Sequence, residues 1–278
     1  MKTIPEALIH TKERMARACA ACGRSPDEVT LLAVSKTHPW SAVAQAAAAG
    51  QRAFGENYVQ EGVDKIAQSK IAQSKISQSQ SQSQSPVYAA VAAADRAAAV
   101  APNAADGPHA CRSPQDLEWH LIGPLQSNKT REVAEHFDWV HSVDRLKIAQ
   151  RLSDQRPAHL PPLQVCLQVN ISGQASKSGV APQEALALAQ AVNALPRLRL
   201  RGLMSIPEPA DDEADRRAPH RALRELRDAL QRADPRLDLP VLSMGMSDDL
   251  EAAIAEGATL VRIGTAIFGR RTTAHAPS

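Results

Sequence analysis

A single lysine ends a short apolar stretch near the beginning of the chain. Residues 30–34 read Thr-Leu-Leu-Ala-Val, and Ser35 and Lys36 follow before Pro39 interrupts the backbone pattern. Such a run is typical of a strand buried on both faces of a parallel sheet. A partly desolvated lysine amine can lose its proton near neutral pH and attack an aldehyde. Lys36 is therefore a candidate nucleophile, although a lysine that only points to solvent would show the same pattern.

Two segments late in the chain carry small residues where an anion could bind. Residues 243–249 read Ser-Met-Gly-Met-Ser-Asp-Asp between a predicted strand and a predicted helix, and Gly264 and Thr265 follow the last predicted strand. Backbone N–H groups at a helix start, together with hydroxyl groups, can bind phosphate. Ser247 or Asp248 could instead be an ordinary cap of that helix. Both interpretations stay open at this point.

Arg262 interrupts an otherwise apolar strand at residues 260–263, Leu-Val-Arg-Ile. A buried arginine keeps its charge and needs hydrogen-bond partners. It could pair with an acid such as Glu56 or Glu118, or it could donate to a ligand. The spacing does not decide between these roles.

The histidines and cysteines predict no metal site. Cys19 and Cys22 form a Cys-x-x-Cys pair on a helical pattern, but no second pair stands at ligand spacing, so we expect reduced structural cysteines. His120, between Trp119 and Leu121, is expected to be a core histidine. The G-x-S-x-G motif of serine hydrolases and the G-x-G-x-x-G motif of dinucleotide-binding sheets are both absent.

The elements that must position these residues alternate regularly. After one extra N-terminal helix at 5–21, strand-like segments alternate with helical patterns, and connections of this length must be crossovers between parallel strands. The predicted fold is therefore α/β, a single (β/α)8 TIM barrel over residues 1–278, with an open doubly wound sheet as the competitor. The predicted strands are 29–35, 52–57, 117–123, 139–143, 163–170, 198–204, 241–244 and 259–264.

In a barrel, the carboxyl ends of all strands meet at one mouth, where active sites form. The residues that this fold would gather there are Lys36, Asn57, His120, Gly123, Asn170, Met204, Ser205, 243–247 and 262–265.

Residues 67–115 break this alternation. The sequence Lys-Ile-Ala-Gln-Ser at 65–69 repeats at 70–74 and decays into alternating Ser and Gln up to Ser85. A five-residue apolar spacing cannot keep one face on a helix with 3.6 residues per turn, and a Ser/Gln run has nothing to bury. We expect a low-complexity, mostly disordered insertion at about 67–115, with any helix confined to 88–100.

The bulk composition excludes several classes of protein. The chain has 278 residues, of which 44% are hydrophobic and 3% aromatic, and its formal charge is +2. This balance predicts neither nucleic-acid nor membrane binding. No apolar run is long enough to span a bilayer, and residues 1–6 lack the apolar region of a signal peptide, so we expect a cytoplasmic protein.

Ordered blocks over nearly the whole chain resemble the pyridoxal phosphate homeostasis proteins, a family whose barrel is similar to the N-terminal barrel of alanine racemase. The matching blocks are 31–37, 54–61, 119–129, 169–172, 177–179, 202–204, 242–249 and 261–269. The chain departs from the family at the insertion and at His38, where lysine is commoner. Neither departure falls on the cofactor motifs.

The resemblance implies pyridoxal 5′-phosphate as the cofactor, with Lys36 forming the Schiff base and Asn57 lying against the cofactor. It implies that Arg262 faces the pyridine nitrogen, where a cation disfavours protonation and makes the ring a poorer electron sink. The residues implied to hold the phosphate by hydroxyl or backbone N–H are Ser243, Met244, Gly264 and Thr265.

By the same resemblance, the protein would buffer and deliver pyridoxal phosphate inside the cell without robust turnover, and apo pyridoxal-dependent enzymes could be partners. A pyridoxal-dependent racemase-like enzyme is the alternative. Two-base racemisation needs an acid/base on each face of the substrate carbon, and alanine racemases supply one as a tyrosine from a second domain. This chain has only Tyr58 and Tyr88.

Two further possibilities stay open. Lys36 could be the bare Schiff-base lysine of a lyase or aldolase barrel, although such a site would not need the phosphate loops together with Arg262. Lys177, in a Ser/Gly loop, could be a transient acceptor of the cofactor or an ordinary surface lysine.

Overall fold

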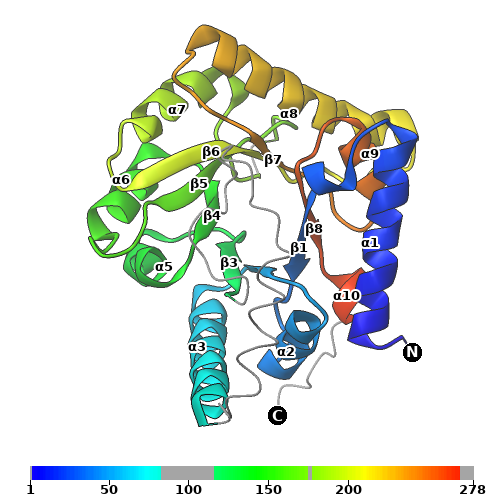
Figure 1. The fold of residues 1–278 in the computed structure, drawn as a ribbon. Helices are drawn as coiled ribbons and strands as arrows, with labels where there is room; N and C mark the ends of the chain where they lie inside the picture. Colours follow the sequence, from blue (N-terminus) through cyan, green and yellow to red (C-terminus); the bar gives the residue numbers. More distant parts are fainter. Residues whose placement is uncertain (1, 83–115, 175–176, 270–278) are drawn as a thin grey trace, which may run out of the picture.

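The computed structural model describes residues 2–82, 116–174 and 177–269. Eight parallel strands in chain order form a closed barrel, and β8 pairs with β1 to close it (Figure 1). The predicted (β/α)8 barrel is thus confirmed, and no strand end differs from the predicted one by more than two residues. The strands are β1 Thr30–Val34, β2 Ala53–Glu56, β3 Glu118–Leu121, β4 Trp139–Val143, β5 Leu163–Gln168, β6 Leu198–Met204, β7 Val241–Ser243 and β8 Leu260–Ile263.

Helices surround the barrel, and three short 3-10 turns precede β1, α5 and α7. The helices are α1 Ile4–Ala21, α2 Trp40–Ala48, α3 Val59–Gln82, α5 Thr130–His136, α6 Leu146–Gln155, α7 Ala185–Asn193, α8 Glu213–Ala233, α9 Leu250–Ala255 and α10 Thr265–Phe268. None of the helices in the described ranges is long and apolar enough to cross a membrane.

The extra helix α1 begins at a capping box. The Thr3 hydroxyl accepts from the Glu6 backbone N–H, and the Glu6 carboxylate accepts from the Thr3 backbone N–H at 2.8 Å. This exchange satisfies two N–H groups that a helix start leaves without partners. Leu8, Met15 and Cys19 then face the core, and α1 packs beside α9 and α10 (Figure 1).

The strands bury both of their faces. Leu31 and Ala33 of β1 pack outward in the large cluster shared with the helices, whereas Leu32 and Val34 belong to a second cluster made almost entirely of strand residues. Burying one such aliphatic side chain contributes about 1.5–3 kcal/mol. This two-sided burial explains why β1 is a nearly continuous apolar run in the sequence.

Helix α3 extends well into the segment that was predicted to be an insertion from about residue 67. Ile66 and Ser69 are buried, but the next isoleucine, Ile71, is 55% exposed, so the five-residue spacing does rotate the apolar side chains away from the core. The backbone nevertheless stays helical to Gln82, because Ala, Lys and Gln are good helix formers. Over residues 67–82 the structure therefore departs from the predicted disorder. Residues 83–115, including the possible helix at 88–100, lie outside the described part of the chain.

Candidate cofactor-binding site

Four neighbouring strands carry the predicted site residues at their carboxyl ends. In the closed barrel, β7 pairs with β8, β8 with β1, and β1 with β2, so these ends are adjacent around one side of the mouth. Strand by strand, the residues are Ser243 and Met244 (β7), Arg262, Gly264 and Thr265 (β8), Lys36 (β1) and Asn57 (β2). The barrel therefore brings together groups separated by more than 200 positions in the sequence.

Lys36 lies immediately beyond the buried end of β1. Ser35 is fully buried, whereas the side chain of Lys36 is half-buried at the rim. The next residue, Thr37, has φ 65°, a left-handed conformation that is unusual for a β-branched side chain. The side chain of Lys36 is thus attached where the backbone turns sharply at the end of β1.

Arg262 is buried inside the barrel, as its position in an apolar strand predicts. Its Nη1 donates to the carbonyl oxygen and the Oγ of Ser243 at 2.6 and 2.9 Å, and its Nη2 donates to the carbonyl oxygen of Ser205 at 2.8 Å. Burial lowers the pKa of Arg262 to about 10, against the opposing effect of Asp249. The guanidinium is therefore still a cation at neutral pH, held in place by three neutral acceptors.

Ser243 continues this contact into a chain of buried polar side chains. Its Oγ lies 2.8 Å from His141 Nδ1, and His141 Nε2 lies 2.9 Å from His120 Nδ1. His120 Nε2 in turn lies 2.7 Å from Oε1 of Glu118. The sequence predicted a core histidine at position 120. It did not reveal this row of side-chain contacts, which connects Glu118 at the start of β3 with Arg262. The available signal was the alternation on β3 and β4, which turns both histidines into the barrel.

The two loops predicted to bind phosphate are only partly accessible. Met244 is buried and the hydroxyl of Ser243 is engaged with Arg262 and His141, whereas the side chain of Thr265 is exposed at the start of α10. Gly264 lies against the end of β1, because a Cβ there would stand 3.1 Å from the Val34 carbonyl oxygen. Among the residues predicted to bind phosphate, Thr265 is thus the most accessible.

The side chain of Asp249 holds the loop after β7 through hydrogen bonds. Asp249 accepts from the Met246 backbone N–H and from His220 Nε2, and it is also the N-cap residue of α9. Burial raises the pKa of Asp249, but these two hydrogen bonds, together with the nearby charges of His220 and Arg262, hold the pKa below the ordinary value. Neither Ser247 nor Asp248, the two caps considered from the sequence, takes the N-cap position.

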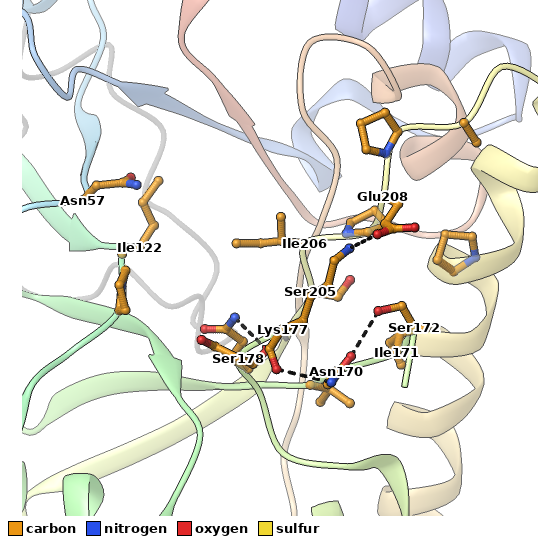
Figure 2. Close-up of a pocket in the computed structure, with 18 of the residues that line it drawn as sticks. Asn57, Ile122, Asn170, Ile171, Ser172, Lys177, Ser178, Ser205, Ile206 and Glu208 are labelled. Atoms are coloured by element: carbon orange, nitrogen blue, oxygen red, sulfur yellow. Dashed lines mark hydrogen bonds and ion pairs between the residues drawn. The ribbon is translucent and has the colours of Figure 1, made fainter. Parts of the chain in front are cut away.

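A cleft of about 460 Å³ opens on the other side of the mouth (Figure 2). Asn57 and Ile122 line one wall and Ser205, Ile206 and Glu208 the opposite one, with Lys177 near Glu208 at 3.5 Å. Of the predicted site residues, Asn57 lines this cleft, so it connects the cleft with the side of Lys36.

Two buried polar atoms at the mouth have no hydrogen-bond partner among the described residues. They are Oδ1 of Asn57 and Oγ of Ser205, both on side chains that line the cleft. A buried polar atom without a hydrogen-bond partner lowers stability by about 1–3 kcal/mol, so such atoms are commonly paired with a ligand or a water molecule. These two atoms therefore offer hydrogen bonds to a small polar ligand at the mouth, where the amine of Lys36 could react with an aldehyde and the exposed Thr265 could bind an anionic group.

Comparisons with known proteins show the family to which this chain belongs. Residues 8–272 match the family described as alanine racemase, N-terminal domain. The pyridoxal phosphate homeostasis protein of Pseudomonas aeruginosa is 54% identical over 98% of this chain and 97% of its own length. The structure of PipY from Synechococcus elongatus with pyridoxal phosphate bound has 35% identity and a TM-score of 0.67, covering 92% of this chain and 100% of that one.

A more distant structure shows the fold alone. Alanine racemase from Corynebacterium glutamicum has 15% identity and a TM-score of 0.60, and the match covers 99% of this chain but 63% of the racemase. The fold and the mouth thus define a barrel of the alanine racemase N-terminal class. Within that class, the chain belongs to the family of pyridoxal phosphate homeostasis proteins.

Proposed function

We propose that this protein binds pyridoxal 5′-phosphate covalently through Lys36, and that it buffers the cofactor and delivers it to apo enzymes. The observation that carries the proposal is the gathering of Lys36, Arg262 and Thr265 on adjacent strand ends at one side of the mouth. The family membership and the ligand of PipY support the same cofactor. When bound, the cofactor supplies an aldehyde that condenses with an amine, with loss of water.

The protein residues then have distinct roles. Lys36 supplies the amine, and Arg262 presents a positive charge that disfavours protonation of a pyridine nitrogen beside it. Asn57 offers its unpaired Oδ1 against the ring. Gly264 and Thr265 hold the phosphate, together with the β7 end formed by Ser243 and Met244. A ring kept unprotonated withdraws electrons poorly, which suits storage better than turnover.

The racemase alternative requires a second base on the face opposite Lys36. Tyr58 is 59% exposed beyond the end of β2, and Tyr88 lies outside the described residues. We therefore favour the carrier function.

The test is a spectrum of the purified protein with pyridoxal phosphate, followed by borohydride reduction and mass spectrometry of the labelled peptide. The expected label is on Lys36, and Lys36→Ala should lose both the label and the long-wavelength absorbance. Lys147→Ala, at an exposed position on α6, is the matched control and should behave as wild type. Labelling at another lysine in the wild-type protein would refute the assignment.

A second assay separates carrier from enzyme. The loaded protein is mixed with an apo aminotransferase and, separately, with a panel of L- and D-amino acids. We expect the aminotransferase to regain activity and the amino acids to keep their configuration. Robust racemisation would overturn the carrier function while leaving the covalent site intact.

A further inference from the structure

The two peptide groups on either side of Lys36 are both held by charged side chains of the next β/α unit. The carbonyl oxygen of Ser35 accepts from Lys65 Nζ at 2.7 Å, and the backbone N–H of Thr37 donates to Glu61 Oε1 at 2.6 Å. Ser35 Oγ also donates to Glu56 Oε1 at 2.6 Å. The contacts thus bracket Lys36.

The three charged residues form one closed cluster. Besides the Ser35 carbonyl, Lys65 Nζ donates to Glu56 Oε1 and Glu61 Oε1, each at 2.7 Å, so all three of its N–H groups have acceptors. Lys65 and Glu56 are buried, whereas the side chain of Glu61 is 26% exposed. Burial raises the pKa of Glu56, and Lys65 opposes this rise. Buried charges of this kind are tolerated only in well-formed geometry.

The backbone between these contacts is in a conformation that needs support. Thr37 has φ 65°, and β-branched residues rarely adopt the left-handed region. Such conformations persist where the surroundings over-determine them, and they concentrate at functional sites. Here the Thr37 N–H is fixed by Glu61, one helical turn from Lys65 on α3.

We propose that Glu56, Glu61 and Lys65 are positioning residues that hold the backbone of Lys36, so that its amine meets the bound aldehyde in a reactive geometry. This inference deepens the proposed function and depends on it. Glu61 and Lys65 contact the two peptide groups that flank Lys36. Loss of these contacts should therefore slow the reaction of the Lys36 amine. A misplacement of about 1 Å can slow a reaction by about 100-fold.

The test separates covalent attachment from binding. Pyridoxine 5′-phosphate carries an alcohol in place of the aldehyde, so it can occupy the site without reacting with Lys36. In Glu61→Ala we expect the rate of attachment of pyridoxal phosphate, followed by absorbance, to fall between about 10- and 100-fold. The affinity for pyridoxine 5′-phosphate, measured by calorimetry, should stay unchanged.

Two further variants complete the experiment. Glu61→Gln should fall between wild type and Glu61→Ala, because an amide oxygen can still accept from Thr37 but attracts Lys65 less strongly. Asp64→Ala removes a neighbouring carboxylate of α3 whose side chain bonds to Gln60, and it should attach the cofactor at the wild-type rate. Thermal melting confirms that each variant is folded.

The outcomes are distinguishable. Wild-type labelling at Lys36 with an undiminished rate in Glu61→Ala would overturn the positioning role and leave the proposed function intact. Equal losses of attachment and of pyridoxine 5′-phosphate affinity would also overturn it, because they indicate a general structural effect. A wild-type protein that is never labelled at Lys36 would overturn both proposals.

Discussion

His141 is a buried residue whose protonation would disturb the polar contacts inside the barrel. Burial, then His120 and Arg262, lower the pKa of His141 well below its ordinary value of 6.5. A neutral ring donates from one nitrogen and accepts at the other, so its two hydrogen bonds run in one direction along the chain. A second proton would place a cation against Ser243 Oγ, which already accepts from Arg262. The arrangement therefore depends on a neutral His141.

This dependence predicts how stability changes with pH. Because the folded pKa of His141 is depressed, the unfolded chain binds a proton near pH 6.5 that the folded protein does not. Its stabilising contribution is present above that pH and is lost as the pH falls below it, by at most about 1.4 kcal/mol per pH unit for one site. Urea unfolding of wild type and His141→Gln between about pH 7.5 and 5.5 measures this slope.

The variant should show a shallower loss of stability than wild type over this range. His10→Gln, which changes an exposed histidine of α1, is the control and should keep the wild-type slope. Identical slopes in all three proteins would contradict the assignment of a neutral buried ring at position 141.

The burial of Arg262 was predictable from the sequence, but its partners were not. An arginine within Leu-Val-Arg-Ile had to be buried and had to be satisfied. Its observed acceptors are two carbonyl oxygens and one hydroxyl, from Ser205 and Ser243. Which carbonyl comes within reach depends on the register between β6, β7 and β8, and no residue type signals it.

At the scale of elements, the strands were predictable because they are buried on both faces. A run such as Leu31 to Val34 of β1 is apolar from end to end, with a Thr-His-Pro break shortly after it, so the existence and type of this strand follow from composition. Side-chain contacts between different elements were harder to predict. The Glu61 and Lys65 spacing on α3 indicates an i,i+4 pair, but nothing local shows that this pair reaches the backbone beside Lys36.

The close approach of the β2 and β3 ends gives a prediction at this scale. A Cβ added to Gly123 would stand 2.1 Å from the backbone oxygen of Asn57, so Gly123→Ala must push the two strand ends apart. Overpacking of this kind costs about 1–3 kcal/mol. We expect this loss in urea unfolding, and weaker binding of pyridoxine 5′-phosphate because Asn57 moves.

Gly50→Ala is a suitable control for that variant. Gly50 follows α2 with φ 87°, and no atom lies within 4 Å of the position that a Cβ would take there. Substitution of Gly50 should lower stability only because alanine disfavours this positive φ. The affinity for pyridoxine 5′-phosphate should stay at the wild-type value. Equal effects of both variants on affinity would indicate that the contact between Gly123 and Asn57 is not what places the ligand.

At the scale of the whole molecule, the closed barrel sets where chemistry can occur. The candidate groups of β7, β8, β1 and β2 meet on one side of the mouth only because β8 pairs with β1. Eight alternating units predict such a closed barrel, which is why these strand ends could be expected at one mouth before any distance was known. The cleft beside Asn57 depends on how long loops fold over β5 and β6, and it could not be predicted in this way.

The low-complexity segment gives a prediction about the molecule as a whole. The later part of helix α3 projects away from the barrel (Figure 1). Beyond the buried Ser69, Lys70, Ile71 and Ser74 are exposed. Gln73 and Asp116 line one shallow pocket, so the chain can be rejoined near them. Deleting residues 77–112 should therefore leave the melting temperature and the rate of covalent attachment at Lys36 unchanged.

A longer deletion provides the contrast. Removing 65–112 also removes Lys65, Ile66 and Ser69, which are buried against the barrel. Loss of Lys65 leaves Glu56 as a buried charge without its cation, a change that typically costs about 3–5 kcal/mol, and we expect the protein to melt at a much lower temperature or not to fold. If the shorter deletion were equally damaging, the repeat segment would have to contribute to the stability of the barrel, and its treatment as an insertion would be wrong.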